Sequence, residues 1–144
     1  MSTQATFFDG GNQKKNFQSD DVDMMAKALS GDIAWTVAPA TTTKAATSAA
    51  WTRDVVVRLT DSAGNVHRWF NKAISSGVSV ADTSTAGTAS VASTTLTIVN
   101  GEATVTVSGA AAAWLATETD TLTVASATIL GVTIAAKTSV ETFS

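Results

Sequence analysis

The 144-residue chain contains no cysteine, which excludes disulfide bonds and thiolate metal sites. Charge is also scarce, since only 15% of the residues are Asp, Glu, Lys or Arg and the net charge is −3. The basic residues are scattered, and only Lys14 and Lys15 are adjacent, so the concentrated basic face of a nucleic-acid binder is missing. No apolar run approaches the roughly 18 residues that a membrane span requires. We therefore expect no nucleic acid and no membrane among the partners.

Residues with catalytic potential are equally few. His67 is the only histidine, and it falls in a predicted strand between Val66 and Arg68 without a nearby second ligand or nucleophile. Glu118 and Asp120 have the spacing of one strand face, but no accompanying cleft is indicated. The acidic residues Asp20, Asp21 and Asp23 lack the glycine and closing glutamate of a calcium loop and suit a helix N-terminus better. We expect no enzyme, no metal and no cofactor.

What the sequence does contain is a series of short β-like segments rich in threonine and valine, which favour half-buried pleated surfaces. Alternating apolar and polar residues or short apolar runs predict strands at residues 55–60, 66–70, 77–81, 121–124 and 129–135. Residues 61–65 (DSAGN) predict a turn between the first two. Gly131 predicts a bulge or a close backbone approach within the last segment. Short strands at this spacing are typical of a sandwich of immunoglobulin size.

The dipeptide Asn100-Gly101 gives the clearest local signal, because both residues tolerate the positive φ of a type I′ hairpin turn. Folding the chain there predicts that Val99 faces Glu102. It also predicts that Ile98 pairs with Ala103 and Leu96 pairs with Val105, which leaves threonines on the opposite face. A register shifted by one residue would place those threonines in the core.

Residues 1–51 do not follow the strand pattern and predict an N-terminal arm that precedes the sandwich of residues 52–144. Residues 19–31 predict a short helix, with Ser19 or Asp20 as its N-cap, Gly31 as its C-cap and one apolar face. Such a helix is marginal alone, so its apolar face must dock on the sandwich or on another subunit. Residues 38–50 predict a linker or an irregular edge. We expect the arm to bind a partner through six residues: Phe7, Phe8, Phe17, Met24, Met25 and Trp35.

The tryptophans divide between two predicted roles. Trp51, Trp69 and Trp114 lie within or beside the predicted sandwich, where core packing is the default interpretation. Residues 110–117 are expected to form a crossover loop, or a helical turn, that carries Trp114 into the core. Trp35 lies in the less regular first part, where an interface role and a core role are equally compatible with its position. The predicted core also includes Leu96, Ile98 and Val105.

Four segments of the second part carry a resemblance to a known family. They are residues 61–71 (DSAGNVHRWFN), 94–101 (TTLTIVNG), 119–124 (TDTLTV) and 138–143 (TSVETF). Together they resemble immunoglobulin-like modules of tailed-bacteriophage structural proteins, over about residues 52–144. Such modules occur on capsid decoration (cement) proteins, head fibres and tail proteins. The matching motifs are turns and strand ends, so they imply a fold more firmly than a task.

The resemblance implies an all-β, immunoglobulin-like sandwich with an N-terminal arm carrying one short helix, and a structural role in a virion. Our first hypothesis is a capsid decoration protein, homo-oligomeric on the particle, that binds the major capsid protein or another virion protein at the outer head surface. The alternatives are a tail or baseplate component and an adhesin for host surfaces or glycans. The absence of tyrosine and the internal position of the tryptophans make a surface aromatic platform for sugars the weaker of these hypotheses.

Overall fold

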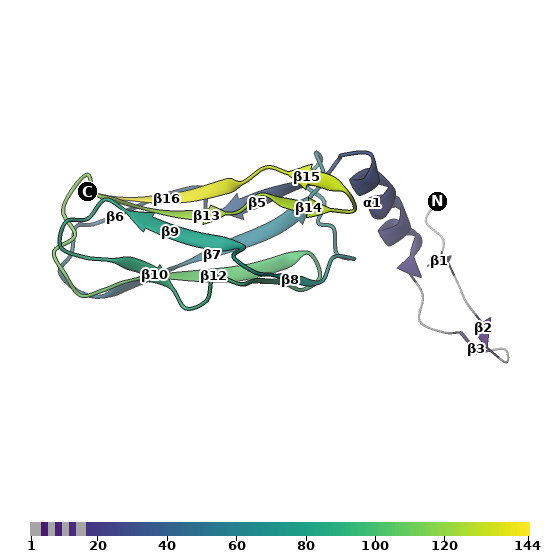
Figure 1. Ribbon diagram of the computed structural model, residues 1–144, viewed down its shortest axis with the longest axis horizontal. Helices are drawn as coiled ribbons and strands as arrows, with labels where there is room; N and C mark the ends of the chain where they lie inside the picture. The colour runs from purple at the N-terminus through teal and green to yellow at the C-terminus, as the bar shows by residue number, and fades with distance from the viewer. Residues whose placement is uncertain (1–3, 6–7, 10–11, 14–16) are drawn as a thin grey trace.

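The computed structural model describes residues 4–5, 8–9, 12–13 and 17–144, with side chains from residue 21 onward. Its main body is a β-sandwich of two four-stranded sheets (Figure 1). The first sheet has the order β10 (Ala89–Val91), β12 (Glu102–Gly109), β7 (Trp51–Thr60), β5 (Ala34–Ala38), with every pair antiparallel. The second has the order β6 (Thr41–Lys44), β16 (Lys137–Phe143), β13 (Thr119–Val124), β9 (Val78–Asp82). Within this second sheet, β6 and β16 pair in parallel and the other pairs are antiparallel.

Two short ribbons extend this body. β8 (Lys72–Ile74) pairs with β11 (Leu96–Ile98), and β14 (Ala127–Ile129) pairs with β15 (Val132–Ile134). The chain moves from the first sheet to the second between β5 and β6, through a cis Ala38-Pro39 peptide bond. The sandwich therefore begins at β5, and not at residue 52 as the sequence pattern predicts. Residues 34–44 supply an edge strand to each sheet, because β5 pairs with β7 and β6 pairs with β16, strands that are distant in the sequence.

The predicted helix is present as α1 (Ser19–Leu29), at one end of the sandwich (Figure 1). Gly31 adopts a φ of 95°, its N–H donates to the Ala28 carbonyl, and the Asp32 N–H donates to the Lys27 carbonyl. These two bonds are those of a Schellman motif, so the predicted glycine C-cap is confirmed. Beyond the helix N-terminus, β1 (Gln4–Ala5) pairs with β4 (Phe17–Gln18), and β2 (Phe8–Asp9) pairs with β3 (Asn12–Gln13). The described residues of the first part of the arm thus form two antiparallel strand pairs, which we call the arm hairpin, rather than a single extended segment.

The core lies between the two sheets and follows the alternation predicted from the sequence. Val55, Val57 and Leu59 of β7 are fully buried, and Leu122 and Val124 of β13 face them from the other sheet. The predicted core residues Leu96, Ile98 and Trp114 are also buried, while Trp69 and Val105 are half-buried against the same cluster. Trp114 reaches the core from the predicted crossover loop.

Three aromatic residues gather at the end of the sandwich opposite α1. The ring centroids of Trp51 and Trp114 lie 5.1 Å apart, and Phe143 lies 5.1 Å from Trp114 and 5.4 Å from Trp51. Gly109 permits this packing, because a Cβ atom there would fall 2.1 Å from Cε2 of Trp51. The packed side chains of Trp51, Trp114 and Phe143 therefore close this end of the sandwich.

The structure confirms the turn at Asn100-Gly101, whose φ angles are 52° and 76°, and the pairing of Val99 with Glu102. The rest of the predicted hairpin register is wrong, since Leu96 pairs with Ile74 and Val105 pairs with Val55. The two strands separate after the turn because β11 pairs with β8 instead, while the edge of β12 that the hairpin would use pairs with β10 farther along the strand. The inward and outward alternation is nevertheless correct, so Leu96 and Ile98 are buried and Thr97 is exposed.

Two further strand predictions need correction. Residues 66–70 form a loop with a single bridge between Thr60 and Val66, because the His67 side chain is engaged with α1's C-terminal segment. Residues 129–135 are not one strand. Leu130 and Gly131 have positive φ angles of 51° and 78° and form the tight turn between β14 and β15.

Candidate interaction surface

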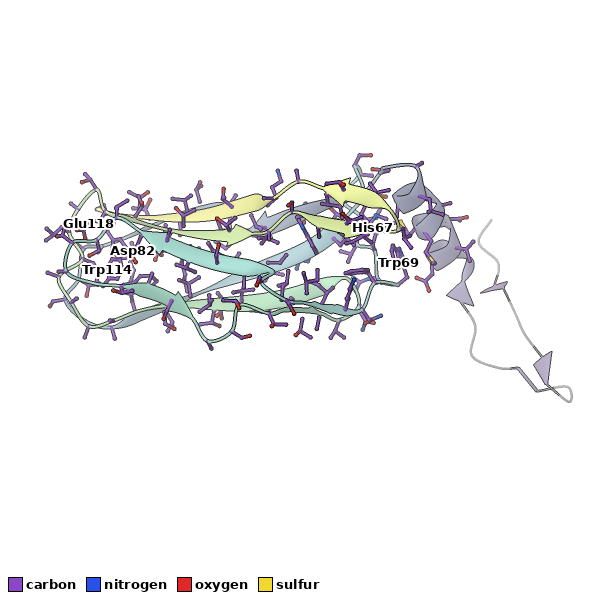
Figure 2. The ribbon with its side chains drawn as sticks, viewed as in Figure 1. His67, Trp69, Asp82, Trp114 and Glu118 are labelled. Atoms are coloured by element: carbon purple, nitrogen blue, oxygen red, sulfur yellow. The ribbon has the colours of Figure 1, made fainter. Side chains whose placement is uncertain are left out.

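Exposed apolar side chains are concentrated at the end of the sandwich that carries α1. Among residues 21–144, five large apolar residues are exposed. Four of them lie at this end: Val22 (46%), Leu29 (63%), Val99 (57%) and Leu130 (42%). The fifth, Leu115, belongs to the opposite end, beside Trp114 and Glu118 (Figure 2). We call the α1 end, with these four residues, the apical surface. The concentration of exposed apolar residues at one end makes this end the candidate surface for binding another protein.

The helix presents two different faces. Ala28 is fully buried against the sandwich, and Met24 and Met25 are half-buried. Val22 and Leu29 are exposed to solvent and lie about two turns apart on the same face of the helix. The predicted apolar face of Val22, Met25, Ala26 and Leu29 is therefore mostly unpartnered within the chain, while a different face docks on the sandwich.

An ion pair fixes α1 on the sandwich. Lys27 Nζ lies 2.8 Å from Asp61 Oδ2, whose side chain is inaccessible to solvent. The other oxygen, Asp61 Oδ1, accepts hydrogen bonds from the N–H groups of Ala63 and Asn65 and so shapes the predicted turn. The hydrogen bond from Lys27 holds the pKa of Asp61 far below its ordinary value and raises the pKa of Lys27. The helix and the turn are thus joined through one carboxylate.

A second connection runs through the only histidine. His67 is completely buried, with Nε2 lying 3.1 Å from the Asp32 carbonyl oxygen and Nδ1 accepting a 3.0 Å hydrogen bond from Trp69 Nε1. The indole can only donate, so Nδ1 is unprotonated and Nε2–H donates to Asp32. Burial lowers the pKa of His67. Both ring nitrogens are occupied, so His67 positions the loop beside α1 (Figure 2).

A cleft of about 600 Å³ separates α1 from the turn after β7. Acidic and basic side chains line the cleft together with the apolar side chains of Met24 and Val66. The complete lining comprises Asp21, Asp23, Met24, Lys27, Gly64, Asn65, Val66 and Arg68. No group of acidic or histidine side chains suited to a metal occurs in the part of the chain that the structure describes. The polar residues of the cleft lie beside the exposed apolar residues, as the polar rim lies beside the apolar centre of a protein interface.

The predicted arm residues have different positions. Met24 and Met25 lie on α1 within the apical surface. The backbones of Phe8 and Phe17 lie in β2 and β4, whereas Phe7 and all three phenylalanine side chains fall outside the described part of the structure. Trp35 is only 1% exposed, and its Nε1 donates to the Ala125 carbonyl oxygen. Its predicted partner-binding role is therefore wrong, because β5 carries its indole between the sheets.

The predicted carboxylate pair performs two separate structural roles. Glu118 accepts hydrogen bonds from the N–H groups of Leu115 and Thr85 and closes the loops at the end opposite α1, and the hydrogen bond from Leu115 lowers its pKa. Asp120 instead turns into the core, where it meets Arg53 from the other sheet. The role of Arg53 was not predicted from the sequence, although a charged residue at an inward position of an apolar strand is a detectable signal.

In the described residues, no helix has the length and apolar character needed to cross a membrane. Comparisons with family models, curated proteins and solved structures find no match to this chain.

Proposed function

We propose that the chain is a structural virion protein whose apical surface binds a large assembly, and that it acts as a capsid decoration protein on the outer surface of a phage head. The observation that carries this proposal is the segregation of exposed apolar residues to the end that also bears the arm. A module that attaches by one end needs this polarity, since the other end and the sheet faces must remain in solvent.

The immunoglobulin-like character of the sandwich belongs to the same proposal, and the strand order supports it. If β5, β7, β10 and β12 are taken as strands A, B, D and E, the first sheet reads A-B-E-D. With β9, β13 and β16 as C, F and G, the second sheet reads C-F-G, and β6 adds a parallel edge to G. The constant-type immunoglobulin fold has the same two orders.

The arm supports attachment by the apical end. A two-stranded hairpin is marginally stable in water, and its principal described contacts are within itself and with α1. Aromatic residues in the hairpin would bury a large area on docking and act as hot spots. Many copies on a symmetric lattice would add avidity to a modest individual affinity.

Binding to capsids tests this proposal. Undecorated expanded heads, assembled from the major capsid protein of the same phage, are mixed with the purified chain and sedimented. We expect saturable binding that Leu29→Glu weakens at least tenfold, because the new charge would be buried at the interface. Leu115→Glu provides the matched control, since it places the same charge on an equally exposed leucine at the opposite end.

Three results would contradict the proposal. They are no binding to heads, equal loss of binding in both variants, or loss only in Leu115→Glu. Binding to assembled tails instead of heads would support the tail or baseplate alternative, and binding to host cells or glycan arrays would support the adhesin alternative.

A further inference from the structure

A buried ionic cluster links the two sheets toward the end of the sandwich opposite α1, where Asp82 lies beside Trp114 and Glu118 (Figure 2). Arg53 projects inward from β7, and its side chain is 7% exposed. Its Nε lies 2.8 Å from Asp120 Oδ1 on β13, and its Nη1 donates to the Ser139 hydroxyl on β16 at 2.8 Å. Its Nη2 also donates to the Ser139 carbonyl oxygen at 3.1 Å. One guanidinium thus joins a strand of the first sheet to two strands of the second.

The cluster contains three carboxyl groups beside the single guanidinium group of Arg53. Asp120 is directly opposite Glu141 on β16 and Asp82 on β9, so the three carboxyl groups share one inward face of the sheet. Asp120 is fully buried, Glu141 is 6% exposed, and Glu141 Oε2 lies 4.0 Å from Arg53 Nε. Asp82 Oδ2 accepts the Ala89 N–H, and Thr42 donates to Glu141 Oε1.

Two oxygens in this cluster lack a donor. Asp120 Oδ2 and Glu141 Oε2 are both buried and have no hydrogen-bond partner. They belong to neighbouring side chains on paired strands, and a carboxylate oxygen can only accept unless its group is protonated. One proton between them would satisfy both oxygens and would leave a single negative charge for Arg53. Two ionised carboxylates would leave both oxygens orphaned in a buried site.

We propose that Asp120 and Glu141 share one proton in the folded chain, and that loss of this proton leaves two facing carboxylates in a buried site, so that the sandwich loses stability as the pH rises. The other charged groups that face the pair are Asp82 from β9 and Lys44 from β6. Asp82 opposes ionisation of Asp120, whereas Lys44 and Arg53 favour ionisation of Glu141 without removing the excess of carboxylates.

The direction of the pH dependence follows from the two carboxyl groups. Burial raises the pKa of Asp120 against the opposing effect of Arg53, and burial together with the charge of Asp120 raises the pKa of Glu141. The folded chain therefore keeps a proton that the unfolded chain releases near pH 4. This contribution to stability is fully present below that pH and is lost as the pH rises through the folded-state value. Each unit of elevation corresponds to about a tenfold change in the folding constant.

Glu141→Gln tests the proposal, because its amide can donate to Asp120 Oδ2 without requiring a shared proton. Urea denaturation of the full chain and the variant is measured at intervals between about pH 4 and pH 9. We expect the urea concentration at the denaturation midpoint of the wild type to fall as the pH rises. We expect this fall to be absent in Glu141→Gln. Glu102→Gln is the matched control: it removes a half-exposed carboxylate paired with Arg58, and we expect it to keep the wild-type pH dependence.

A second measurement keeps the proposal testable if Glu141→Gln does not fold. The side-chain carboxyl carbons of wild-type Asp120 and Glu141 are followed by NMR through the same titration. We expect the two signals to move together, with a midpoint above the ordinary carboxyl range. Independent titration of both groups near pH 4, or a variant that retains the full alkaline loss, would overturn the proposal.

Discussion

One glycine and one histidine determine how the two ends of the sandwich are closed. Gly109 is required by the ring of Trp51, because the two come closer than any side chain at position 109 would permit. His67 is required for its two hydrogen bonds. Its buried ring accepts from Trp69 Nε1 and donates to the Asp32 carbonyl oxygen. Neither requirement depends on a ligand.

Gly109→Ala is expected to lower the free energy of unfolding by about 1–3 kcal/mol, because the added methyl group must displace Trp51 from the aromatic cluster. Urea denaturation measures the change. Gly64→Ala serves as the comparison, since its Cβ would meet no atom within 4 Å and only its positive φ of 87° opposes the substitution. A Gly109→Ala variant as stable as the wild type would show that the rings do not pack as described.

His67 is expected to titrate below its ordinary value of 6.5, because burial disfavours the charged ring. A depressed histidine pKa means that the unfolded chain takes up the proton first, so this contribution to stability is lost as the pH falls below about 6.5. NMR of the single histidine gives the value without ambiguity, and ring nitrogen shifts should show Nε2 protonated. A titration midpoint at or above 6.5 would contradict the burial of the ring.

At the scale of the elements, local chemistry was predictable from the sequence and pairing was not. The C-cap at Gly31 and the turn at Asn100-Gly101 each depend on a few consecutive residues, and both were predicted correctly. The partners of Leu96 and Val105 depend on competition between ladders, which no local pattern encodes. The Arg53–Asp120 contact spans 67 positions in the sequence and could not be deduced from either residue alone.

The arm hairpin is expected to be dispensable for folding. Removing residues 1–18 should lower the free energy of unfolding by less than about 1 kcal/mol, because the principal described contacts of the arm are with itself and with α1. The same deletion should strongly reduce binding to capsids. Thermal denaturation and sedimentation with heads measure the two effects. Unfolding of the truncated chain, or undiminished binding, would show that the hairpin belongs to the sandwich and not to an interface.

At the scale of the whole molecule, the chain combines a body of two packed sheets with one end that carries four of the five exposed large apolar residues of residues 21–144. Disulfides are absent, and in addition to the apolar core an ion pair between Arg53 on β7 and Asp120 on β13 connects the two sheets. Under the proposed immunoglobulin-like assignment these are strands B and F, which a disulfide joins in antibody domains. The exposed apolar residues at the α1 end are the part of the molecule that this body would hold against a partner.

The orientation of the bound chain tests the attachment account most directly. A cryo-electron microscopy reconstruction of heads saturated with the chain would show which end contacts the shell. We expect α1, Leu29 and the arm at the shell surface, with the Trp51–Trp114–Phe143 end directed outward into solvent. Attachment through the aromatic end or through a sheet face, with α1 exposed to solvent, would contradict the account.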